Sequence, residues 1–94
     1  MANNQMSKLD ELIQEGEQVR QTCSSDTGIM GITISGEPLE IWVGKSVIYI
    51  EGNSPSDFIK ERFLDAAERV NGGVIKYFDI MLGSLKAIKA NQAD

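Results

Sequence analysis

The chain contains 94 residues with 41% hydrophobic and 24% charged side chains, and its formal net charge is −5. These values are typical of one small globular domain, and they exclude a globally disordered chain. The acidic balance disfavours general binding to DNA, RNA or an anionic membrane, because such partners require a basic surface.

The first predicted element is a helix that starts at Ser7, after residues 1–6, which we expect to fray. Ser7 is a suitable N-cap, and Asp10 stands three residues later, as the acidic residue of a capping box does. Gly16 falls inside this helix, where glycine is about 1 kcal/mol less favourable than alanine. We interpret Gly16 as a close helix crossing, and a helix end at this position is the alternative.

Residues 24–36 are expected to form a loop, since they begin with Ser-Ser-Asp-Thr-Gly. Residues 31–36 nevertheless alternate like a strand between two glycines. If the apolar residues that follow continued this pattern, the fold would be α+β with a short β-hairpin within 29–50. The competing interpretation is a helix from Pro38 to Glu51, with proline in its first turn. Periodicity alone does not decide between the two.

The clearest boundary in the sequence precedes the next helix. Ser54 is a candidate N-cap, Pro55 fits the first helical position and Asp57 the capping-box position. We expect this helix to run over 58–70 and to end at the Asn-Gly-Gly sequence of residues 71–73, because these residues accept the left-handed conformation.

The most apolar element is the predicted last helix over 74–88, which is followed by a tail at 90–94. Its apolar residues recur at intervals of three and four and form a stripe wider than one partner helix requires. A chain this small also gains burial by oligomerising. We therefore expect a homo-oligomer, with an interface formed by Val74, Phe78, Met81, Leu82, Leu85 and Ile88.

The sequence offers few groups for catalysis. It contains no histidine, and its single cysteine, Cys23, has no imidazole to activate it. The carboxylates are scattered over helix exteriors, and no glycine cluster carries the lysine and hydroxyl of a phosphate-binding loop. We therefore expect no enzymatic activity, no metal and no cofactor. One cysteine, no signal peptide and no bilayer-long apolar run together favour a cytoplasmic protein without a membrane partner.

Four residues form the only candidate ligand face, if the segment around them is helical. Trp42, Lys45, Ser46 and Tyr49 then stand at positions i, i+3, i+4 and i+7. In one interpretation they belong to the core, with the lysine amine reaching water. In the other, an aromatic ring stacks on a base while lysine and serine meet a phosphate, so a small nucleotide is the expected ligand.

Three segments in this order resemble a known group of proteins: residues 9–16 (LDELIQEG), 40–50 (EIWVGKSVIYI) and 83–88 (GSLKAI). They are similar to the N-terminal helical region of bacterial defence proteins, including abortive-infection (AbiTii-like) proteins and nucleotide-binding proteins with TIR-like domains. The resemblance covers about residues 9–88 and implies that the Trp42 segment is helical. The effector domain that follows this region in the larger proteins is absent from these 94 residues, so no catalytic activity carries over. Gly44, inside the Trp42 helix, departs from the pattern.

Together these features predict a single all-α domain of about four helices. We expect a non-enzymatic interaction or oligomerisation module related to bacterial or phage defence, whose partner is a defence protein with a matching helical domain. The alternative is a phage-type sponge that sequesters a nucleotide-derived immune signal at an oligomer interface. A module requires a protein partner, whereas a sponge binds a small anion.

Overall fold

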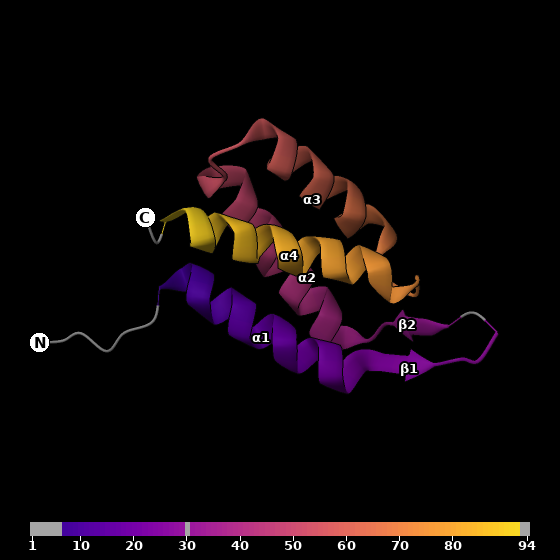
Figure 1. The fold of residues 1–94 in the computed structure, drawn as a ribbon. Helices are drawn as coiled ribbons and strands as arrows, with labels where there is room; N and C mark the ends of the chain where they lie inside the picture. The colour runs from indigo at the N-terminus through magenta and orange to yellow at the C-terminus, as the bar shows by residue number, and fades with distance from the viewer. Residues whose placement is uncertain (1–6, 30, 93–94) are drawn as a thin grey trace, which may run out of the picture.

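The computed structural model describes residues 7–29 and 31–92, which form four helices and one two-stranded hairpin (Figure 1). In chain order the elements are α1 (Lys8–Cys23), β1 (Ser24–Asp26), β2 (Ile32–Ile34), α2 (Glu37–Asn53), α3 (Asp57–Arg69) and α4 (Ile75–Gln92). The small helical bundle is confirmed, as is the helical interpretation of the Trp42 segment. Residues 1–6, expected to fray, and residues 93–94 of the expected tail lie outside the described residues, while residues 90–92 continue α4.

Helix α1 begins as its sequence predicts and crosses two other helices at its centre. The Ser7 side chain accepts a hydrogen bond from the Asp10 amide at 3.1 Å. Gly16 is buried, and a Cβ atom at this position would lie 2.9 Å from Cδ1 of Leu82 and 3.0 Å from Cζ2 of Trp42. Gly16 therefore marks a close helix crossing, and α1 continues past it to residue 23.

The prediction of a loop over 24–36 is wrong, because β1 and β2 pair antiparallel within it. The strand-like alternation of residues 31–36 corresponds to β2. The α+β alternative placed a hairpin in 29–50, so only β2 lies inside that range. Tertiary contacts explain the pairing, since Ile34 is 0% exposed. Its amide donates to the Gly73 carbonyl at 3.1 Å, and its carbonyl accepts from the Gly72 amide at 2.8 Å. The hairpin is thus fastened to the connection between α3 and α4.

Helix α3 begins at Asp57, one residue before the predicted start, and its N-cap is Ser56 instead of Ser54. The Ser56 hydroxyl accepts from the Ile59 amide at 3.3 Å. Ser54 is instead the C-cap of α2, where its amide donates to the Ile50 carbonyl at 3.1 Å. Its hydroxyl instead bonds the backbone of Ser56 and shapes the turn between the helices.

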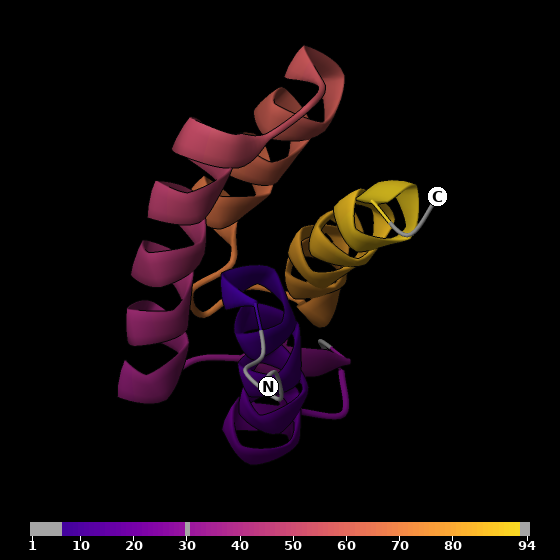
Figure 2. The same cartoon turned by 90° about the vertical axis from the view of Figure 1, so that its left-hand side faces the viewer.

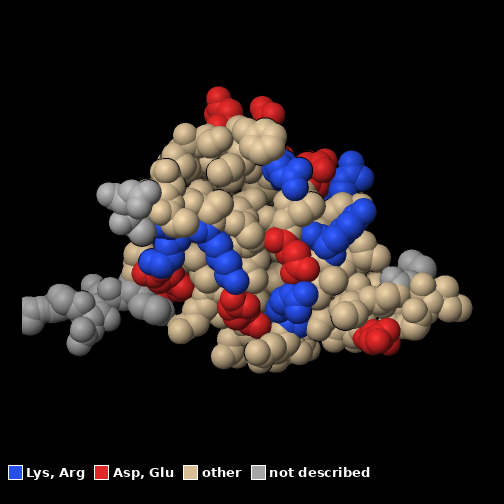
Figure 3. All heavy atoms as spheres, in the orientation of Figure 1, with Lys and Arg blue, Asp and Glu red and all other residues tan. Residues whose placement is uncertain are grey.

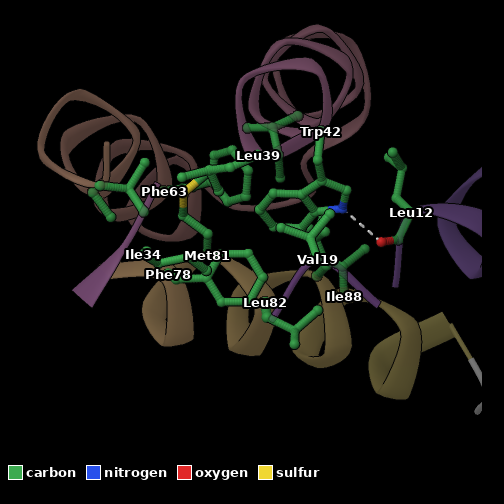
Figure 4. Packing of buried hydrophobic residues seen from close by; sticks show 14 of the residues in the cluster. Leu12, Val19, Ile34, Leu39, Trp42, Phe63, Phe78, Met81, Leu82 and Ile88 are labelled. Atoms are coloured by element: carbon green, nitrogen blue, oxygen red, sulfur yellow. Dashed lines mark hydrogen bonds between the residues drawn. The ribbon is translucent and has the colours of Figure 1, made fainter. Parts of the chain in front are cut away.

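One apolar core lies among the four helices. In Figure 2, α2 and α4 occupy opposite sides of the molecule, with α1 below and α3 above. Trp42 of α2 and Phe78 of α4 meet with ring centroids 4.8 Å apart. The indole N–H donates to the Leu12 carbonyl of α1 at 2.8 Å, as the dashed line in Figure 4 shows. A single aromatic contact therefore links α1, α2 and α4.

Ion pairs connect α1 to α4 along the surface. Arg20 pairs with Asp79 at 2.9 Å, Glu17 with Lys86 at 2.7 Å, and Asp10 with Lys89. Acidic and basic side chains touch along this seam in Figure 3. As the residue numbers of the partners decrease along α1, they increase along α4, so α1 and α4 are antiparallel.

Candidate functional site

The structure places the candidate ligand face mostly in the interior. Trp42 and Ser46 are both 0% exposed, which is the core role that the sequence left open for them. Lys45 reaches the surface but pairs with Glu15 of α1 at 2.7 Å, and Tyr49 is half-buried against the core. In this conformation the four residues do not form an open surface, and a base cannot stack on the indole.

The predicted oligomer interface is also used inside the chain. Five of its residues are at most 5% exposed and belong to the core, namely Phe78, Met81, Leu82, Leu85 and Ile88. Val74 is half-buried and forms an isolated β-bridge with Thr33 of the hairpin. The breadth of the stripe is explained by contacts of α4 with α1, α3 and β2, so a second copy has to bind elsewhere.

An open groove lies between α3 and α4, with a volume of about 500 Å³. Its apolar part contains Phe58, whose side chain is 70% exposed although phenylalanine is normally among the most buried residues. The remaining lining residues are two isoleucines, three charged residues and three small residues, namely Ile59, Ile80, Arg62, Lys76, Asp79, Gly83, Ser84 and Ala87. We call this feature the α3/α4 groove.

The shape of the groove follows from the sequence of α4. Gly83 and Ala87 stand four residues apart on one helical face and contribute almost no side-chain volume. A Cβ atom at Gly83 would meet nothing within 4 Å, so the groove is open directly above this backbone. A second helix can approach α4 closely at this point.

The charged residues that line the groove differ in whether they have an ion-pair partner. Asp79 is already bound by Arg20, through hydrogen bonds of 2.9 and 3.2 Å, and this contact raises the pKa of the Arg20 guanidinium. Arg62 and Lys76 form no ion pair with any described residue. The Arg62 guanidinium lies over the Phe58 ring at 6.0 Å, and the Lys76 amine over the Tyr77 ring at 5.2 Å. The groove is therefore apolar with two uncompensated positive charges.

Sequence reasoning missed this groove for two reasons. The helix predicted over 58–70 begins at Phe58, which lies one position off the apolar helical face on which Ile59 and Phe63 stand four residues apart. The position of a phenylalanine off the apolar face of its helix was the sequence signal that could have indicated the groove. Gly83 carried no signal, because only the neighbouring helix shows that the space above it is empty.

Other kinds of site are not found in the described part of the chain. Residues 7–29 and 31–92 contain no group of three or more histidine, cysteine or acidic side chains placed to hold a metal ion. None of the helices in these residues combines the length and apolar character needed to cross a membrane. Comparisons with protein-family models, curated proteins and solved structures find no match to this chain.

Proposed function

We propose that this chain is a non-enzymatic protein-interaction module that receives an amphipathic helix in the α3/α4 groove. The observation that carries the proposal is the exposed Phe58 beside an open apolar groove. Exposed apolar surface of this kind, bordered by polar residues, commonly marks an interaction site, and aromatic side chains are frequent anchors of binding energy.

The chemistry of the groove favours a partner helix with acidic residues along its flank. Arg62 and Lys76 are the charges that remain uncompensated, so acidic side chains would meet them. An apolar stripe with spacing i, i+3, i+4 and i+7 fits the space above Gly83 and Ala87. The resemblance to the helical region of bacterial defence proteins suggests the setting, in which the partner is a defence protein with a matching domain.

Two synthetic helical peptides test this proposal by fluorescence anisotropy. They share one leucine stripe, and one carries glutamate on its flanks where the other carries lysine. We expect the acidic peptide to bind and the basic peptide not to bind. Phe58→Ala should weaken the binding at least tenfold, which corresponds to about 1.4 kcal/mol. Equal binding of both peptides, or full affinity of the Phe58→Ala variant, would contradict the proposal.

The nucleotide-sponge alternative has lost its expected ligand face, because Trp42 and Ser46 are buried. A tightly bound ligand raises the melting temperature by mass action. We expect an unchanged melting temperature across a panel of cyclic and linear nucleotides. A clear increase with one of them would favour the sponge over the interaction module.

A further inference from the structure

A second unpartnered apolar surface lies on α2. Ile41 and Ile48 are 52% and 74% exposed, and Gly44 stands between them at helical spacing. A Cβ atom at Gly44 would meet nothing within 4 Å, so packing within the chain does not require glycine there. Glycine is unfavourable inside a helix, and close approach of another backbone is a reason to retain it.

The charges beside this stripe are acidic. Glu37, Glu40 and Glu51 are exposed and form no ion pair with a residue in the described ranges. The only basic residue of α2, Lys45, is occupied by Glu15 of α1. The outward surface of α2 is thus apolar and acidic, which is the chemistry expected of a helix that enters the α3/α4 groove.

We propose that α2 of a second copy of this chain is the occupant of the α3/α4 groove. Ile41 and Ile48 of one copy pack beside Phe58 of the next, and Gly44 permits close approach over Gly83. Arg62 and Lys76 meet the acidic residues of α2. This inference rests on the proposed function and identifies the partner.

The contact joins two different surfaces, so a two-fold dimer would have to form both reciprocal contacts, α2 of each copy with the groove of the other, at the same time. An α2–α2 contact would bring acidic residues together, and a groove–groove contact would bring Arg62 and Lys76 toward their own copies. Both arrangements are disfavoured by like charges. Helices α2 and α4 lie on opposite sides of the molecule (Figure 2). Successive copies therefore add head to tail, in a ring or in an open chain.

Two variants that each damage one surface provide the test. Ile48→Lys removes an exposed apolar side chain from α2 and adds a charge that repels the basic groove. Gly83→Leu adds a branched side chain to the groove at a position where the Cβ atom itself would meet nothing within 4 Å. The matched controls are Ile29→Lys, at a residue that is 100% exposed outside both surfaces, and Gln92→Leu, at the exposed end of α4 and on the helical face opposite Gly83.

Analytical ultracentrifugation should show that the wild-type protein and both controls associate, and that 0.5 M salt weakens the association. Each damaged variant alone should be monomeric. An equimolar mixture of the two variants should form a 1:1 heterodimer, in which the intact α2 of Gly83→Leu occupies the intact groove of Ile48→Lys. The heterodimer should not grow further, because its two remaining surfaces are the damaged ones. A monomeric wild-type protein, an associating single variant, or a mixture without heterodimer would overturn the proposal.

Peptide binding to Ile48→Lys, whose groove is intact, separates failure of this inference from failure of the proposed function. If the acidic peptide binds this variant while the wild-type protein stays monomeric, the groove receives a helix from another protein. The proposal that a second copy is the occupant is then wrong. If neither association nor peptide binding is observed, the groove is not a docking site and both proposals fail.

Discussion

Gly16 and Trp42 form the point at which three helices meet. Gly16 removes the side chain that would separate α1 from Trp42 and Leu82, and the indole N–H then reaches the Leu12 carbonyl. The Gly16 crossing was predictable from sequence, because a glycine that weakens a helix calls for a packing reason. The role of Trp42 was not predictable, because a helical aromatic stripe is equally compatible with a core and with a ligand face until its neighbours are known.

Alanine substitution at Gly16 and at Gly83 should change stability in opposite directions. Both glycines are inside helices, so alanine gains up to about 1 kcal/mol of helix propensity at either position. At Gly16 the added Cβ would lie 2.9 Å from Cδ1 of Leu82 and 3.0 Å from Cζ2 of Trp42, so these side chains have to shift, and overpacking of a core typically costs about 1–3 kcal/mol. At Gly83 it meets nothing within 4 Å.

Urea unfolding, followed by circular dichroism at a protein concentration at which both variants are monomeric, measures this difference. We expect Gly83→Ala to raise the free energy of unfolding and Gly16→Ala to lower it. Equal stabilisation by the two substitutions would show that the close crossing at Gly16 is absent.

At the scale of elements, the first strand of the hairpin is the part of the fold that the sequence did not indicate, whereas the alternation of residues 31–36 did indicate the second. Residues 24–26 have the composition of a turn, and nothing in their pattern indicates a strand. Their pairing depends on Ile34, which the amide and carbonyl groups of Gly72 and Gly73 hold in place. This contact spans almost 40 residues of sequence, so no local pattern reveals it. The helices, by contrast, are indicated by capping residues and by the helical spacing of apolar residues, and both signals lie within a short stretch of sequence.

Ile34→Ala should lower the free energy of unfolding by about 2–4 kcal/mol, because truncation of a fully buried isoleucine leaves a cavity. Ile29→Ala is the matched control, since the same side chain is 100% exposed in the hairpin turn. Its effect should stay within about 0.5 kcal/mol. Thermal and urea unfolding measure both variants. Similar stabilities for the two would mean that the hairpin is not part of the core.

At the scale of the whole molecule, the exposed apolar surface does not lie where the sequence predicts it, on the last helix. The apolar stripe of α4 is buried by the chain's own elements, and the large exposed apolar residues lie on the hairpin, α2 and α3 instead. The width of the stripe was visible in the sequence, but a wide stripe fits several intramolecular partners as well as a second copy. The number of partners becomes known only when the packing of all four helices is known.

The α1–α4 seam predicts how stability responds to acid. The hydrogen bond from Lys89, followed by that from the Ser7 side chain, lowers the pKa of Asp10 below its ordinary value of 3.8. A carboxylate with a lowered pKa in the folded state stabilises the protein above its unfolded pKa, and this contribution is lost as the pH falls through the folded value. Asp10→Asn should therefore destabilise the protein at pH 7.

The difference between wild type and Asp10→Asn should disappear as the pH falls below the lowered pKa of Asp10. Urea unfolding at a series of pH values from neutral to strongly acidic measures it. Glu11→Gln, in the same first turn but without an ion pair in the described structure, controls for the loss of one negative charge near the helix N-terminus. A pH-independent difference for Asp10→Asn would contradict this role of the seam.

The fastening of β2 to the α3–α4 connection also has a consequence for synthesis on the ribosome. When α1, the hairpin and α2 have left the exit tunnel, the Ile34 amide and carbonyl still lack the Gly72 and Gly73 groups that pair with them. Trp42 likewise still lacks Phe78. Until α4 has also left the tunnel, the nascent chain consequently exposes the surfaces that later become the core. Folding is thereby delayed until α4 has emerged, and protection of the emerging chain by chaperones matters most during that interval.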